Sequence, residues 1–117
     1  MSCPEFIARS MALRTAAHLA HLSSESYAQH VALGDFYSAL IDLVDQYAEV
    51  YMGTSGRIKS FPPITPPAGN LISHLTAYLD LIGAEQAEDG ENRALGNILD
   101  EIKALTAQTI YKLRFLK

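Results

Sequence analysis

The spacing of apolar residues along the chain is helical on both sides of one break. The break covers residues 53–69, which hold four of the five prolines. Proline cannot continue a helix interior because it lacks a backbone N–H, and this stretch has no alternation of polar and apolar residues that would favour a strand. We therefore expect helical segments before and after a proline-rich connection.

Two helices are predicted before the break, over residues 4–22 and 25–52. Ser2 and Glu5 have the spacing of a capping box at the start of the first helix, and Ser24 is placed to cap the second. Gly53 is expected to end the second helix. Apolar residues at steps of three and four mark one stripe on this helix: Leu33, Phe36, Tyr37, Leu40, Val44, Tyr47 and Tyr51.

Two further helices are predicted after the break, over residues 70–85 and 91–115, with a turn at Asp89-Gly90 between them. Both segments carry apolar residues at helical spacing. Four amphipathic helices in a single domain of 117 residues favour an all-α four-helix bundle.

The connection 53–69 is long enough to change the topology of such a bundle. The second helix, of about 28 residues, would be about 42 Å long. A proline-rich connection of 17 residues extends to about 50 Å. Neighbouring antiparallel helices need only a few linking residues. This length therefore favours a crossover along the bundle that joins two helical hairpins, and the alternative is a surface loop between simple antiparallel helices.

Composition limits the class of protein. Apolar residues make up 49% of the chain and charged residues 19%, which is enough apolar surface for a folded core and argues against disorder. The net charge of −4 argues against nucleic-acid binding through phosphate contacts. The single cysteine, Cys3, excludes an intrachain disulfide, and the sequence has neither a membrane-spanning run nor a signal peptide. We expect a cytoplasmic protein with no membrane partner.

Two histidines and two carboxylates are the candidate metal ligands. His18 and His30 lie about six residues on either side of the break near residue 24, so their imidazoles can converge in an antiparallel hairpin. Asp45 and Glu49 are four residues apart and present carboxylates on one face of the second helix. Such a set of nitrogen and oxygen ligands suits iron, manganese or zinc. His21, one turn from His18, is a further candidate ligand.

These ligands cannot meet within one chain. His30 and Asp45 are fifteen residues apart on one helix, hence about 22 Å apart along its axis, whereas metal–ligand bonds are about 2 Å long. Two copies of this helix packed antiparallel across a two-fold axis would bring His30 of one copy to Asp45 of the other. The crossing point predicts a dimer interface at Ser38, Ala39 and Ile41. A two-fold dimer repeats each contact, so it would hold two equivalent sites.

The spacing of these ligands resembles that of a known family. Twelve residues lead from His18 to His30, fifteen more to Asp45 and four more to Glu49. This pattern resembles the ferroxidase centre of Dps-like mini-ferritins, in which the histidines of one subunit and the carboxylates of its two-fold mate bind iron. The resemblance implies a ferritin-like fold with the crossover, bound iron, and Fe(II) oxidation as an activity.

The tract over residues 14–53 also resembles small tailed-phage proteins that are predicted to share this fold, and the ending IYKLRFLK is similar to theirs. Two positions depart from the mini-ferritin pattern, because Leu19 stands in place of a tryptophan and Gly34 in place of an acid. The chain also lacks the lysine-rich tail with which some mini-ferritins hold DNA. Together with the acidic balance, this argues against a DNA-protecting shell.

These departures leave open a hypothesis of a different class. A phage-encoded helical interaction or sequestering protein would keep the bundle and the dimer, have no metal chemistry, and act in the host cytoplasm. Its partner would be a host defence factor, a nucleotide signal or a virion component. Basic residues such as Arg57 and Lys59 in the connection would, in a further alternative, clasp a small anionic ligand between subunits.

Overall fold

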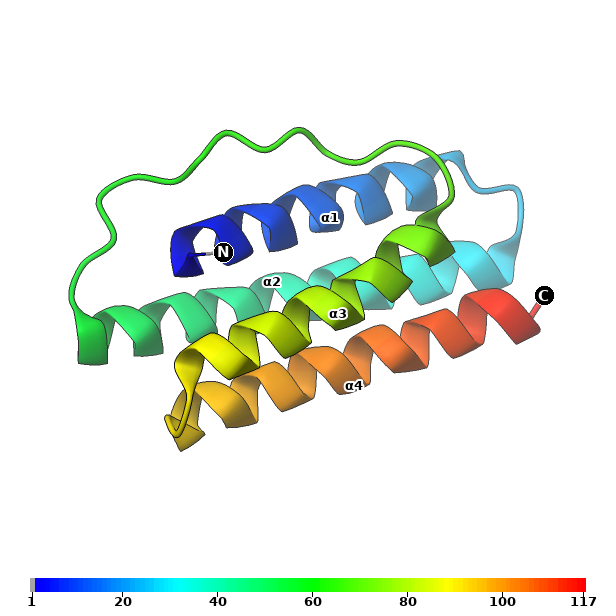
Figure 1. The fold of residues 1–117 in the computed structure, drawn as a ribbon. Coiled ribbons are helices and arrows are strands. Elements are labelled where there is room, and N and C mark those ends of the chain that lie inside the picture. Colours follow the sequence, from blue (N-terminus) through cyan, green and yellow to red (C-terminus); the bar gives the residue numbers. More distant parts are fainter. Residues whose placement is uncertain (1) are drawn as a thin grey trace.

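The fold is all-helical. A computed structural model describes residues 2–117 and contains four helices: α1 (Cys3–Ser23), α2 (Tyr27–Ser55), α3 (Leu71–Asp89) and α4 (Arg93–Phe115) (Figure 1). No strand occurs among the described residues. The prediction of an all-α protein with four helices is therefore confirmed. Within the same residues, no helix is both long and apolar enough to span a membrane.

The long connection between α2 and α3 determines how the helices are arranged. α1 and α2 run antiparallel, and so do α3 and α4, so each pair forms a hairpin (Figure 1). Residues 56–70 pass over α1 from the end of α2 to the opposite end of the molecule, where α3 begins. α2 and α3 therefore point in the same direction. Contacts join α1 to α2, α2 to α4, α4 to α3 and α3 to α1, so each helix has two neighbours around one core.

The start of α2 differs from the prediction. Ser2 caps α1 as its spacing to Glu5 predicts, by accepting a hydrogen bond from the Glu5 backbone N–H at 3.4 Å. The prediction that Ser24 caps α2 is wrong, because Ser26 takes that position and accepts the N–H three residues further on at 3.2 Å. The Ser24 hydroxyl instead accepts the Ser26 N–H at 3.1 Å and folds the linker into a turn. α2 therefore begins at Tyr27.

The ends of α2 and α3 also lie beyond their predicted positions. Gly53 does not end α2, because a glycine inside a helix costs only about 1 kcal/mol relative to alanine. The chain leaves the helix at Gly56, whose φ is +98° and whose N–H donates to the carbonyl of Met52. Glycine adopts a positive φ without strain. α3 continues past residue 85 to Asp89 and ends at Gly90, where φ is +61°.

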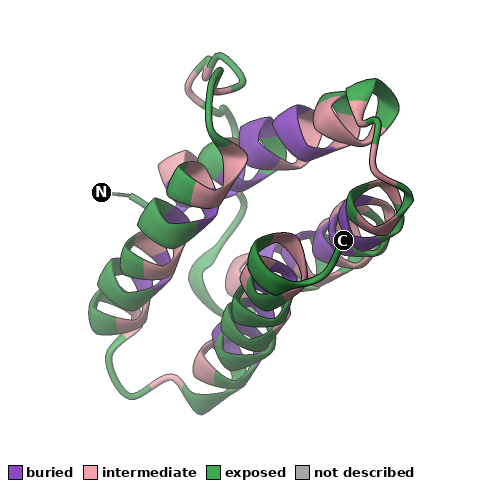
Figure 2. Cartoon of the chain, turned by 90° about the vertical axis from the view of Figure 1, so that its right-hand side faces the viewer, coloured by how far each residue is buried: buried purple, intermediate pink, exposed green. Residues whose placement is uncertain are grey.

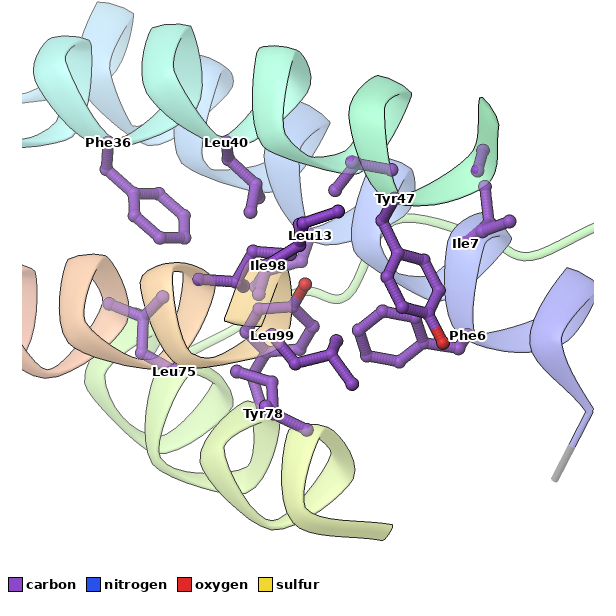
Figure 3. Close-up of a cluster of buried hydrophobic side chains, with 14 of the residues drawn as sticks. Phe6, Ile7, Leu13, Phe36, Leu40, Tyr47, Leu75, Tyr78, Ile98 and Leu99 are labelled. Atoms are coloured by element: carbon purple, nitrogen blue, oxygen red, sulfur yellow. The ribbon is translucent and has the colours of Figure 1, made fainter. Parts of the chain in front are cut away.

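Buried residues of all four helices form one core. The parts of the ribbon coloured as buried lie mainly on the sides of the helices that face each other (Figure 2). At one end of this core, the ring of Phe6 packs edge-on against Tyr47 at 5.5 Å and stacks on Tyr78 at 6.0 Å between ring centroids (Figure 3). The Tyr78 hydroxyl lies 2.7 Å from the buried Ser10 hydroxyl, which satisfies both groups. Phe6 thus joins α1 to both α2 and α3.

Candidate functional site

A pair of stacked histidines lies where α1 ends and α2 begins. The rings of His21 and His30 are 3.7 Å apart between centroids and nearly parallel, at 17°. The His21 Nδ1 lies 2.5 Å from the His30 carbonyl oxygen, and the His30 Nδ1 lies 2.8 Å from the His21 carbonyl oxygen. Because a carbonyl oxygen only accepts hydrogen bonds, both rings carry a hydrogen on Nδ1. In the neutral rings the lone pair is then on Nε2, the form in which a histidine binds a metal through that atom.

The absence of a side chain at Gly34 leaves room for this pair. A Cβ at position 34 would lie 3.1 Å from Cε1 and 3.3 Å from Nδ1 of His21. These distances are shorter than ordinary van der Waals contact, so His21 fills the space that a side chain at this position would take. Gly34 is also the position at which the mini-ferritin pattern has an acid. A side chain at position 34 would displace the His21 ring.

His18 has different neighbours from those expected. Its ring stacks on Tyr37 at 4.1 Å and lies edge-on to His21 at 6.1 Å. The guanidinium of Arg14 lies over the other ring of this stack, 5.7 Å from the centroid of Tyr37. The residue that contacts His30 is therefore His21. The reason is the shifted start of α2: the middle of the turn lies near residue 25, so His21 is the α1 residue opposite His30.

The two candidate carboxylates lie on the exposed side of α2. Asp45 and Glu49 are both exposed. The one ion pair among residues 2–117 joins Arg9 and Glu5, so neither carboxylate has a cationic partner within the described chain. The described residues contain no group of three histidine, cysteine, aspartate or glutamate side chains close enough to hold a metal ion. A site built from these ligands therefore needs a second copy of the chain.

The predicted interface residues lie on the surface of α2 between the histidines and the carboxylates. Ser38 is exposed, and Ala39 and Ile41 are half-buried. Ser38 and Ala39 have small side chains and Ile41 is uncharged. The backbone of another helix can therefore approach this part of α2. The dimer through this surface stays a prediction.

A second cluster of polar groups, which was not predicted from the sequence, lies at the other end of the molecule. The hydroxyl oxygen of Tyr47 lies 2.6 Å from Glu85 Oε2 and 2.7 Å from Asp89 Oδ2. Glu85 is buried, with 1% of its surface exposed. We call Tyr47, Glu85 and Asp89 the carboxyl cluster. Continuing the apolar stripe of α3 by steps of three and four from Tyr78 reaches both carboxyls, and this is the signal that could have found them.

Burial changes the protonation behaviour of this cluster. Desolvation is the largest cause that raises the pKa of the Glu85 carboxyl, and the charges of Asp89 and Glu88 raise it further. The pKa of Asp89 is also raised, again mainly by desolvation. Cys3 packs beside the cluster, where burial and the nearby carboxyls raise the pKa of its thiol to about 12.

The chain belongs to the protein family DUF5856, described as a family of unknown function, whose model matches residues 21–113. That span includes His30, Asp45 and Glu49 and leaves out His18. The chain is also similar to an uncharacterised 14.6 kDa protein from the mobD–ri intergenic region of Enterobacteria phage T4. The two are 31% identical over 111 residues, which cover 93% of this chain and 85% of the relative. No solved structure matches.

These comparisons confirm part of the sequence-based resemblance. A phage protein is indeed similar to this chain over almost its whole length. Neither the family nor the relative carries a ferritin-like description. The mini-ferritin resemblance and the bound iron that it implies therefore stay hypotheses, supported by the ligand spacing alone.

Proposed function

We propose that the protein is a ferritin-like homodimer that binds a transition-metal ion, iron in the first place, between two antiparallel copies of α2. The observation that carries the proposal is the placement of unengaged ligand groups on one helix. The Nδ1–H of His30 is used by a carbonyl, which leaves Nε2 for a ligand. Asp45 and Glu49 are exposed and have no cationic partner within residues 2–117.

The length of α2 requires the second copy. His30 and Asp45 are separated by fifteen residues of continuous helix, which is about 22 Å. An antiparallel partner that crosses near Ser38 places its own Asp45 and Glu49 beside His30 of the first chain. One ion would then have His30 from one subunit and the two carboxylates from the other. His18 would be a further ligand from the first subunit once its ring turns away from Tyr37, on which it stacks. This mixture of imidazole and carboxylate ligands fits iron, manganese and zinc.

His21 has a positioning role in this site. The lone pair of Nε2 lies in the plane of its ring, and the rings of His21 and His30 are stacked and nearly parallel, with their centroids 3.7 Å apart. Two such rings do not aim at one point, so His21 and His30 do not chelate the same ion. The carbonyl of His21 instead holds the Nδ1–H of His30 at 2.8 Å and fixes which nitrogen is free. Histidine ligands of metals are commonly held by such outer contacts.

Bound iron would supply the electron chemistry if the protein oxidises Fe(II), and the protein would position the ion. The chain contributes the ligands and the two-fold arrangement that brings them together. A dimer of this kind holds two equivalent ions.

Metal stoichiometry measured together with molar mass tests the proposal. Equilibrium dialysis against Fe(II), Mn(II) and Zn(II), followed by elemental analysis, is expected to give two ions per dimer of the wild type. His30→Ala and Asp45→Ala are expected to lose the ions. His74→Ala and Asp42→Ala are matched controls, a histidine on α3 and an exposed carboxylate on α2, and both are expected to keep them. A monomeric wild type, or equal binding by all four variants, would overturn the proposal.

A mixing experiment distinguishes a site shared between subunits from a site within one. One variant carries His18→Ala with His30→Ala, and the other carries Asp45→Ala with Glu49→Ala. Each alone should bind no ion. After joint unfolding and refolding, the mixed dimer takes histidines from one chain and carboxylates from the other, so it should recover one ion and, with Fe(II), any oxidation activity of that site. A site within one chain recovers nothing.

A second candidate function is favoured by exposed apolar side chains at one end of the molecule. Tyr27 of α2 is 82% exposed, and Phe115 and Leu116 at the end of α4 are 66% and 47% exposed. Tyr27 and Leu116 line a shallow groove of about 280 Å³ between these helices. A phage-encoded interaction protein without metal chemistry would use such a surface for a protein partner. Protein from iron-replete cells without bound metal, and a partner that is lost in Phe115→Ser, would favour this function.

A further inference from the structure

The carboxyl cluster lacks a proton if all its groups have their ordinary charges. Tyr47 Oη is 2.6 Å from Glu85 Oε2 and 2.7 Å from Asp89 Oδ2, and both distances are those of short hydrogen bonds between oxygens. A phenol has one hydrogen and can direct it at one of the two carboxyl oxygens. If both carboxyls were ionised, the other contact would bring two lone pairs together. The geometry therefore requires a second proton between these three side chains.

Burial favours Glu85 over Asp89 as the group that holds this proton. Its side chain is 1% exposed, and its second oxygen, Oε1, is buried without a hydrogen-bond partner among the described residues. An ionised carboxylate in such a place would lose its hydration without gaining a cation. Asp89 is only partly buried and remains accessible to water. Desolvation accordingly raises the pKa of Glu85.

The groups around Glu85 come from three helices. Tyr47 faces it from α2, and Asp89 and Glu88 act on it from α3. Cys3 of α1 contributes a neutral thiol, because its own pKa is raised to about 12. The α-amino group opposes the carboxylates and is the smallest of these influences. The surroundings of Glu85 are thus acidic or neutral on every described helix that contributes to them.

We propose that Glu85 stays protonated at neutral pH, donates to Tyr47, and together with the Tyr47–Asp89 hydrogen bond forms a proton-dependent clasp between α2 and α3. The clasp lies at the end of the molecule opposite the histidine pair and does not depend on the proposed metal site. Loss of its proton would leave a buried negative charge beside Asp89 and weaken this end of the fold.

The sign of the pH effect follows from the raised pKa. In the unfolded chain Glu85 releases its proton near pH 4.5, whereas in the folded chain it keeps it to higher pH. The contribution of Glu85 to the free energy of unfolding is therefore fully present below about pH 4.5. It falls as the pH rises towards the pKa of Glu85 in the folded chain. For one proton, the unfolding equilibrium constant rises about tenfold per pH unit across this interval.

Infrared spectroscopy and urea unfolding test the clasp together. The wild type at pH 7 should show the carbonyl stretch of a protonated carboxylic acid, and Glu85→Gln should lack it. Between pH 5 and pH 7, at fixed protein concentration, the unfolding constant of the wild type should rise about tenfold per unit relative to Glu85→Gln. Glu101→Gln, an exposed acid on α4, should keep both the band and the wild-type pH profile.

Several outcomes would overturn the proposal. A wild type without the protonated band at pH 7 refutes it even if no variant folds. A band that persists in Glu85→Gln places the proton elsewhere. Parallel pH profiles of the wild type and Glu85→Gln show that no proton is held by this group. Asp89→Asn should retain the band, because an asparagine oxygen still accepts the Tyr47 hydrogen bond.

Discussion

Replacing Gly34 by alanine tests how tightly the histidine pair is packed against α2. In an open helix interior this change stabilises by about 1 kcal/mol. At Gly34, however, the new Cβ would lie 3.1 Å from Cε1 of His21, so the ring must move. Its movement disrupts the two hydrogen bonds between His21 and His30 and their opposing carbonyls. Each is worth about 0.5–1.5 kcal/mol net.

Gly83 provides the matched control. It lies in the interior of α3, and a Cβ there meets no atom within 4 Å. Gly83→Ala should therefore stabilise by about 1 kcal/mol. Gly34→Ala should be about 0.5–3 kcal/mol less stable than Gly83→Ala, because it loses one or both of the histidine hydrogen bonds. Urea unfolding followed by far-ultraviolet circular dichroism measures both variants.

Adding His21→Ala to each glycine variant completes the test. Without the imidazole, the Cβ at position 34 meets no ring, so both alanine substitutions should stabilise by the same amount. If Gly34→Ala and Gly83→Ala stabilise the protein equally while His21 is present, the His21 ring moves aside without loss of stability. A difference that persists after His21→Ala would show that the loss has another source. Either result refutes the packing argument.

Three other predictions follow from packing, capping and burial. Phe6→Ala should lower the free energy of unfolding by about 3–5 kcal/mol, because a fully buried ring is lost. Phe61→Ala, in the exposed connection, should change this free energy little. Thermal unfolding compares the two variants. Ser26→Ala should lower the free energy of unfolding by about 1 kcal/mol, because α2 loses its N-terminal cap. Replacement of the exposed Ser23 by alanine should lower it less, and urea unfolding measures both. Cys3 should stay unreactive to a thiol reagent at pH 8 until urea unfolds the chain, because the thiol is buried and its pKa is about 12; rapid labelling of the folded protein would contradict this.

The helices could be predicted because their apolar spacing reports directly on the buried face. Most residues of the predicted stripe of α2 are buried, namely Leu33, Phe36, Leu40, Val44 and Tyr47. The helix ends were less predictable, because they depend on local competition between polar groups. Two serines near the start of α2 can each cap the helix. The sequence alone does not say which of them is the cap and which forms the preceding turn.

The site could be predicted only in part for the same reason. A displacement of the helix start by two residues changes which α1 histidine faces His30, and so His21 takes the place expected for His18. The carboxyl cluster was missed because charged residues are rarely buried. Glu85 and Asp89 belong to an apolar stripe by position, while their residue type suggests a solvent-exposed turn.

The crossover has a consequence for how the two hairpins stay together. The α1–α2 and α3–α4 contacts join segments that are close in the chain, whereas the α1–α3 and α2–α4 contacts depend on the tether over residues 56–70. Because this tether spans the molecule and joins the two hairpins, their association is intramolecular and their effective concentration is high. Proteolytic cleavage of the tether would leave every interhelical contact intact but make the association of the hairpins bimolecular, so the cleaved protein would dissociate on dilution while the intact chain would not.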